Sequence, residues 1–252
     1  DVGTFTFTGS NGWASQNIST ATAGVPVAGT TQILTQNVAT TLSETAVAGY
    51  RLAALSCSGL GAGGNASYDL VTRTVDLDAA AMAPGADVVC SFINQRQRTL
   101  SVSKSVTPLT DPGLFVLNAD GSSSAAGGHG NSVNRVVDVG SSVNVSEVAG
   151  PGTDLANYSS SYSCNTTPVL AGSGTTAGFT MPNADIDCIF SNIRRSASLT
   201  LAKAWQQAIT GDAATVTSTG FTNDASSGLS ISTGNNTTTG GASLFMPVKA
   251  AA

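Results

Sequence analysis

Short runs of alternating apolar and polar residues recur along this chain of 252 residues. Residues 4–7 (Thr-Phe-Thr-Phe) and 100–106 (Leu-Ser-Val-Ser-Lys-Ser-Val) are typical, and clusters of Gly, Asn and Asp separate such runs. Residues two apart lie on the same face of a β-strand, so a period of two predicts half-buried strands joined by turns. A helical period is rare, and its best example, residues 203–209, is only about two turns long. The pattern predicts an all-β protein.

Two parts of the chain repeat the same features in the same order. The only two glutamates, Glu44 and Glu147, are each followed by a glycine, a tyrosine and a cysteine, while Lys104 and Lys203 end similar Leu-x-(Val/Leu)-x-Lys segments. Two Cys-x-Phe-x-Asn segments, residues 90–94 and 188–192, complete the pattern. Matching positions lie about one hundred residues apart, which is the length of a small domain, so the sequence predicts a tandem array.

We predict antiparallel β-sandwich domains over residues 1–97 and 98–196, and a partial third repeat or strand-donating tail over residues 197–252. The segment from Asp1 aligns with the segment from Asp111, so the first domain lacks the lysine-bearing strand that precedes this point in the second. Two explanations stay open. The chain is a segment of a longer array, or the strand that bears Lys203 in one molecule completes the first domain of the next, head to tail.

Composition narrows the classes of partner. Charged residues make up 10% of the chain and the net charge is -5, whereas binding to phosphates requires clustered Lys and Arg, so we expect no nucleic-acid partner. The pairs Arg96/Arg98 and Arg194/Arg195 are interpreted as solvated charges. No apolar run approaches the roughly 20 residues of a membrane-spanning helix. With one histidine and no Cys-x-x-Cys, neither a metal site nor a cofactor is predicted.

The four cysteines allow three pairings, and the repeat selects one of them. Each domain has one cysteine after its tyrosine and one in its last strand, which predicts the disulfides Cys57–Cys90 and Cys164–Cys188. Each is expected to stabilise its domain by about 2–4 kcal/mol. Disulfides persist in oxidising compartments, so we expect an extracellular or cell-surface protein.

Strand alternation predicts that Lys104, Glu147 and Asn192 face an apolar core. Lys104 alternates with valines, and Asn192 follows Cys188 and Phe190 at intervals of two. Burying an unpaired charge is costly, so such groups pair, become neutral or react. One interpretation is therefore a buried Lys–Glu ion pair with the asparagine hydrogen-bonded nearby.

The order of these features, a lysine on a first strand, a Glu segment and Phe-x-Asn on a last strand, resembles the CnaB or SpaA-type prealbumin-like domains of bacterial pilins and surface adhesins. The resemblance implies that the Lys104 amine attacks the Asn192 carboxamide, that ammonia leaves, and that Glu147 assists. The product is an intramolecular isopeptide bond. Desolvation is expected to lower the pKa of the lysine and to raise that of the glutamate, which suits this reaction.

The resemblance is complete only in the second domain. The first domain contains Glu44 and Asn94 in the matching places but no lysine, and the third segment contains only Lys203. The second domain departs from the family pattern by extra residues before Tyr158, and its lysine strand lacks the usual aromatic start. The disulfides also differ from the commonest members of the family.

We interpret the chain as a structural repeat segment of an extracellular bacterial filament, pilus-like fibre or adhesin stalk. Its partners are then neighbouring repeats or other copies, and the only chemistry expected is a single-turnover cross-link rather than enzyme activity. The alternative is a ligand-binding adhesin module that recognises a glycan or host protein, for which Trp13 and Trp205 are the aromatic candidates. His129, in a glycine-rich loop, is expected to be exposed. Asp pairs at residues 76/78 and 185/187 are expected to be solvated rather than calcium ligands.

Overall fold

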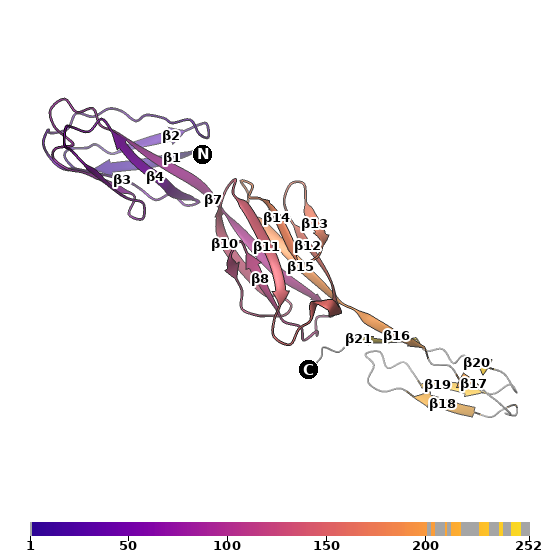
Figure 1. Cartoon of the computed structure of the whole chain (residues 1–252). Helices are drawn as coiled ribbons and strands as arrows, with labels where there is room; N and C mark the ends of the chain where they lie inside the picture. The colour runs from indigo at the N-terminus through magenta and orange to yellow at the C-terminus, as the bar shows by residue number, and fades with distance from the viewer. Residues whose placement is uncertain are drawn as a thin grey trace. The chain divides into compact units, whose positions relative to one another are not determined.

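The computed structural model describes residues 2–200, 203–204, 210, 213–217, 227–231, 237–238 and 243–247. Strands account for almost all of its regular structure, and the single helical element among these residues is the 3-10 turn Leu155–Asn157 (Figure 1). The all-β prediction is confirmed. No helix in this part of the chain has the length and apolar character needed to cross a membrane. Trp205 and the side chain of Lys203 lie outside the described residues.

The chain divides into two compact units. The first contains Asp1–Thr99, Val136–Ser142 and Thr180–Asp185, and the second contains Leu100–Arg135, Val143–Phe179 and Ile186–Ala252. Two short segments that the sequence repeat assigns to the second domain thus group with the first unit. The boundaries predicted after residues 97 and 196 stay predictions.

The first unit packs two sheets against each other. One has the order β2 (Gln16–Thr20), β1 (Gly3–Gly9), β3 (Thr40–Glu44), β6 (Thr74–Leu77), β5 (Ala66–Asp69), with antiparallel neighbours. The other pairs β4 (Tyr50–Ser58) with the first half of the long strand β7 (Val89–Thr107). Apolar side chains of β6, mainly Val75 and Leu77, meet Leu55 and Phe92 of the second sheet. The alternation in the sequence supplies this core because every second residue of each strand points inward.

The second unit also contains two sheets, with the second half of β7 in the middle of one of them. One sheet has the order β10 (Ser132–Asp138), β7, β15 (Ile186–Arg194), β12 (Tyr158–Cys164), β13 (Leu170–Ser173). The other has the order β14 (Thr176–Thr180), β11 (Ser142–Ala149), β8 (Phe115–Ala119), β9 (Ser122–Ser123). β7 and β15 are parallel, with Leu100 opposite Ile186. This pair departs from the antiparallel arrangement that we expected, because the first and last strands of the unit run side by side in the same direction.

A tight turn and a dense core explain the local structure of the second unit. The β8–β9 hairpin turns at Asp120 and Gly121, whose φ angles of 49° and 92° are those of a type I′ turn, for which Asp-Gly is favoured. Phe115, Leu117 and Phe190 are fully buried in the core.

After β15, the described residues form three antiparallel pairs. These are β16 (Ser196–Thr200) with β21 (Ser243–Pro247), β17 (Lys203–Ala204) with β20 (Thr237–Thr238), and β18 (Ala213–Thr217) with β19 (Ser227–Ile231).

Candidate cross-linking site

Lys104 points into the core of the second unit. It lies on β7 between Val102 and Val106, which are 0% and 1% exposed, and Lys104 itself is 3% exposed. The alternation of the strand places all three side chains on the inner face, as the sequence predicts.

The ammonium group of Lys104 has three close neighbours. Nζ lies 2.8 Å from Oε2 of Glu147, donates a hydrogen bond of 3.1 Å to the backbone carbonyl of Phe190, and lies 4.5 Å from the centroid of the Phe115 ring. Glu147 comes from β11 in the facing sheet, where Val143 and Val145 share its inward face, and both side chains of the ion pair are fully buried. The Glu147 carboxylate has no further hydrogen bond among the described residues, so this ion pair is its main contact.

Asn192 lies beside this pair on β15. The parallel register places Lys104 opposite Phe190 and Asn192 opposite Val106, so the lysine and the asparagine are offset by two residues on neighbouring strands. Asn192 is 1% exposed, and within the described part of the chain neither Oδ1 nor Nδ2 has a hydrogen-bond partner. An unsatisfied buried polar group costs about 1–3 kcal/mol, so this carboxamide calls for a functional explanation.

Electrostatics favour the reactive form of the lysine. Burial lowers the pKa of Lys104, and the hydrogen bond and negative charge of Glu147 only partly oppose this effect. A lowered pKa favours the neutral amine, which is the form of lysine that can act as a nucleophile. The structure brings together the three residues that the sequence singled out in this domain.

The first unit has a glutamate and an asparagine at the equivalent positions, but an arginine rather than a lysine contacts the glutamate. Glu44, 3% exposed at the end of β3, accepts a hydrogen bond of 2.9 Å from Nδ2 of Asn94. Arg73 completes the group: Nη1 lies 3.0 Å from Oε1 of Glu44 and 3.3 Å from Oδ1 of Asn94, and Nη2 donates to the carbonyl of Tyr50 at 3.0 Å. Burial raises the pKa of Glu44, against the opposing effects of Asn94 and Arg73.

Sequence reasoning missed Arg73. The residue lies in the β5–β6 turn with φ of 58°, where Asp69 accepts hydrogen bonds from two backbone amides of the turn. One signal was present, since Arg73 is the only Lys or Arg between Arg51 and Arg96 in the sequence and a buried glutamate requires a counter-charge.

A second polar group ties down the last strand of the second unit. The Tyr158 hydroxyl donates to Asp111 at 2.6 Å, and Arg194 forms an ion pair with Asp111 while its guanidinium lies 4.6 Å from the Tyr158 ring centroid. In the first unit, Arg96 lies 4.6 Å from the ring of Tyr50. The interpretation as a solvated charge is therefore wrong for Arg194, whose side chain is only 6% exposed and stacks on an aromatic ring. Arg195 is exposed, as expected.

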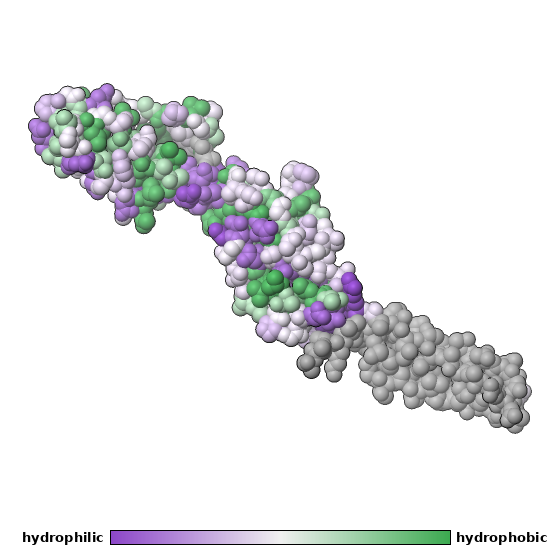
Figure 2. Space-filling view, in the orientation of Figure 1, coloured by the Kyte–Doolittle hydropathy of each residue, from purple (hydrophilic) through white to green (hydrophobic). Residues whose placement is uncertain are grey.

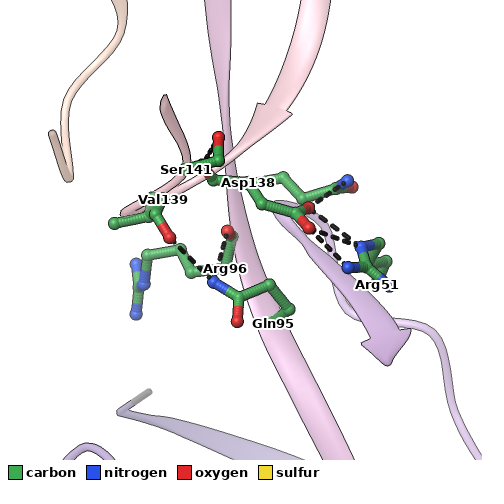
Figure 3. Close-up of polar contacts among 7 residues, drawn as sticks. Arg51, Gln95, Arg96, Asp138, Val139 and Ser141 are labelled. Atoms are coloured by element: carbon green, nitrogen blue, oxygen red, sulfur yellow. Dashed lines mark hydrogen bonds and ion pairs between the residues drawn. The ribbon is translucent and has the colours of Figure 1, made fainter. Parts of the chain in front are cut away.

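A more exposed polar cluster lies within the first unit (Figure 3). Arg51 forms an ion pair with Asp138, and Gln97 donates to the same carboxylate at 3.0 Å. Gln95 donates to the carbonyl of Val139 at 3.0 Å. The Arg51 side chain is 47% exposed, so this ion pair contributes little to stability and mainly positions the turn.

Both disulfides join the cysteines that the sequence repeat pairs. Cys57 and Cys90 lie opposite each other on β4 and β7, and Cys164 and Cys188 do so on β12 and β15. Each bridge joins a strand to its antiparallel neighbour in the sheet.

The other candidates take no part in these sites. His129 is exposed, as expected, and its Nδ1 accepts a hydrogen bond from the backbone amide of Val106 at 3.2 Å. Among the described residues, no group of three or more His, Cys, Asp or Glu is arranged to hold a metal ion.

The chain was compared with known protein families and solved structures. Residues 1–96 match the family SpaA_4, described as a prealbumin-like fold domain. No curated protein matches the chain. A major pilin of Streptococcus pyogenes, solved as a point mutant, is 12% identical over 77% of this chain and 92% of its own, with a TM-score of 0.28. The T3.2 major pilin of the same species is 13% identical over 77% and 91%, with a TM-score of 0.29.

Over residues 1–96 the chain matches a prealbumin-like fold domain, which agrees with the two packed sheets of the first unit. Within this range the resemblance seen in the sequence is confirmed.

Proposed function

We propose that the chain is a load-bearing segment of an extracellular bacterial filament, pilus-like fibre or adhesin stalk, whose second domain is locked by an isopeptide bond between Lys104 and Asn192. The observation that carries the proposal is the fully buried Lys104–Glu147 pair beside an asparagine whose carboxamide has no hydrogen-bond partner among the described residues. Burial, adjacency and a depressed lysine pKa supply what amide exchange requires.

The reaction needs only these three side chains. Lys104 passes a proton to Glu147 and its neutral Nζ attacks Cγ of Asn192. The Nζ–Cγ bond forms first and gives a tetrahedral carbon. Nζ then loses a second proton, Nδ2 gains one through Glu147, and the Cγ–Nδ2 bond breaks to release ammonia. The carbon is an amide before and after the exchange, so no oxidant or reductant enters the balance. The dry surroundings strengthen the electrostatic contribution of the carboxylate.

The position of this bond suits a structural role. Lys104 lies on the strand by which the chain enters the second unit, and Asn192 lies on the last strand, close to where the chain leaves it. A bond between them carries tension directly from one strand to the other, so the residues between Lys104 and Asn192 leave the load path. Covalent bonds rather than sheet hydrogen bonds then resist the force.

The adhesin alternative has no comparable support. Trp13 is half-buried and its indole nitrogen is buried, so it does not present an exposed aromatic platform. On the face shown in Figure 2, apolar and polar residues are interspersed over the first and second units. Among the described residues, no site for a glycan or a host protein is identified, and Trp205 lies outside them.

Single-molecule stretching of the whole oxidised chain tests the load-bearing role. We expect the wild type to show no extension from the segment between Lys104 and Asn192. Asn192→Ala keeps the Lys104–Glu147 pair and removes the carbon that is attacked, so the segment outside the Cys164–Cys188 loop should add about 200 Å. Asn94→Ala is the matched control and should leave the second unit inextensible. Equal extension of wild type and Asn192→Ala would overturn the proposal.

A further inference from the structure

A serine lies directly opposite the asparagine of the proposed cross-link. Ser160 on β12 is the antiparallel partner of Asn192 on β15. Four residues further along β12 lies Cys164, which is bridged to Cys188 of β15. This disulfide shows that the even-numbered residues of the two strands share one face of the sheet, because its two side chains meet there. Ser160 and Asn192 therefore point to the same side of the sheet, toward the core.

The two side chains belong to the closer of the two kinds of antiparallel pair. The Cα atoms of Cys164 and Cys188 are 4.0 Å apart, and a short separation of about 4.5 Å is typical of a pair that exchanges no backbone hydrogen bonds. The two kinds alternate along a ladder without a bulge, so the pair four residues away is of the same kind. The carbonyl of Ser160 agrees, because it accepts a hydrogen bond of 2.9 Å from Gly174, just after β13, rather than from β15. Side chains of such pairs have Cβ atoms roughly 4.5–5.5 Å apart.

Both polar groups of this pair lack partners. Neither the Ser160 hydroxyl nor the Asn192 carboxamide forms a hydrogen bond with another described residue. Asn192 is 1% exposed, and Ser160 is half-buried. A hydroxyl that can rotate thus lies next to a buried carbonyl oxygen that has no donor.

The first unit has a leucine at the equivalent position. Leu52 on β4 lies opposite Asn94 and is 5% exposed. The carboxamide of Asn94 already has polar partners at both its oxygen and its nitrogen. The hydroxyl therefore occurs beside the carboxamide that lacks partners, and an alkyl group fills the same place beside the carboxamide that has them.

We propose that Ser160 is the oxyanion donor of the cross-linking reaction, a role that rests on the proposed function. When Nζ of Lys104 attacks, Oδ1 of Asn192 gains negative charge as its carbon becomes tetrahedral. The Ser160 hydroxyl turns about its Cα–Cβ bond and donates a hydrogen bond to this oxygen, which stabilises the charge in a low-dielectric core. Catalytic hydrogen bonds commonly tighten only as the reaction proceeds, so the bond is absent from the resting site.

This role leaves the balance of the exchange unchanged. Ser160 keeps its proton throughout and adds to the rate of a reaction that Lys104, Glu147 and Asn192 carry out. Glu147 serves the two nitrogens that gain and lose protons, whereas Ser160 serves the oxygen.

A matched pair of full-length variants separates the hydroxyl from the shape of the side chain. Threonine keeps the hydroxyl, valine has nearly the same shape without it, and both suit a strand. Each chain is synthesised in a cell-free extract under oxidising conditions and quenched in acid at intervals. The intact mass is then measured after reduction, so that a loss of about 17 Da reports the cross-link alone. Ser160→Thr should react within a few-fold of the wild-type rate, and Ser160→Val about 100-fold more slowly.

A third variant and a folding control keep the result decisive. Ser160→Ala removes the hydroxyl without adding bulk and should be as slow as Ser160→Val, and hydrogen exchange on β12 and β15 shows that each variant folds. Equal rates for threonine and valine, whether both fast or both slow, overturn the role of Ser160, as does an alanine variant that reacts at the wild-type rate. A folded wild type that keeps its full mass overturns the proposed function as well, so the two failures are distinguishable.

Discussion

The two units contain a glutamate and an asparagine at equivalent positions of the repeat, but a different cation contacts the glutamate in each. In the second unit Glu147 contacts Lys104, which is delivered by a strand that seals the core. In the first unit Glu44 contacts Arg73, which is delivered by a turn. An amine in a dry core can lose its proton and react, whereas a guanidinium cannot. The choice of cation therefore separates the site that we propose forms a covalent bond from one that holds an ion pair.

The largest expected effect comes from removing the buried carboxylates. Glu147→Ala leaves Lys104 buried without a counter-charge and without its proton acceptor, so we expect the second unit to lose about 3–5 kcal/mol of unfolding free energy. Hydrogen exchange read separately on β11 and β15 measures this loss. Glu44→Ala should cost the first unit less, because Arg73 can turn to solvent. Equal losses would contradict the distinction between the two sites.

Removing the disulfides should have the next largest effect. Replacing Cys57 and Cys90 by serine is expected to cost the first unit about 2–4 kcal/mol. The same change at Cys164 and Cys188 should cost the second unit less, because β15 is held along both edges and the closed loop spans 24 rather than 33 residues. Urea unfolding of the two double variants gives the comparison. A larger loss in the second unit would show that the pairing of β15 along both edges does not compensate for the missing bridge.

Removing the hydroxyl of Tyr50 or Tyr158, which begin β4 and β12, should lower the unfolding free energy of the two units by different but smaller amounts. The Tyr158 hydroxyl is buried and donates to the charged Asp111, so Tyr158→Phe should destabilise the second unit by about 1.5–3 kcal/mol. Tyr50 donates to the backbone carbonyl of Val2 at a more exposed position, and Tyr50→Phe should cost less than about 1 kcal/mol. Thermal unfolding of the two variants measures both losses. A loss for Tyr158→Phe no larger than that for Tyr50→Phe would show that the Tyr158 hydroxyl does not stabilise the second unit.

The smallest effect is a pH dependence of opposite sign at Glu44 and Asp111. Burial holds the pKa of Glu44 above 4.5, so the folded first unit binds more protons than the unfolded chain, and its unfolding free energy should fall as pH rises from about 4.5 through the folded pKa. Burial also raises the pKa of Asp111, but hydrogen bonds from Arg194 and Tyr158 outweigh it and bring the pKa below 3.8. The unfolding free energy of the second unit should therefore rise with pH up to about 3.8.

Variants that cannot titrate provide the control. Glu44→Gln should flatten the fall in the first unit, and Asp111→Asn should flatten the rise in the second. Hydrogen exchange between pH 3 and 6, corrected for the intrinsic exchange rate, reads both units in one sample. Unchanged slopes in both variants would show that other carboxyl groups control the acid range.

The sequence predicted what depends on repetition and alternation. A period of two and a domain-length repeat were enough for the all-β fold, both cysteine pairs and the inward direction of Lys104, Glu147 and Asn192. These features are encoded locally, because each strand fixes which side chains share a face.

Features that depend on tertiary approach could not be predicted. Arg73 reaches Glu44 from a turn with φ of 58°, and the second domain has no counterpart in sequence to point to it. Arg194 was interpreted as a solvated charge because nothing in the sequence places Asp111 and Tyr158 beside it. The parallel pairing of β7 and β15 follows from the path of the whole chain and not from either strand alone.

The intact mass of the oxidised monomer tests the central claim most directly. The wild type should be lighter by about 17 Da, the mass of one ammonia, than the mass calculated from its sequence with both disulfides formed. Fragmentation should place the link between Lys104 and Asn192. Asn192→Ala should have its full calculated mass, and Asn94→Ala should still show the loss. A folded wild type with its full calculated mass would contradict the account and leave Lys104, Glu147 and Asn192 as a buried polar group that does not react.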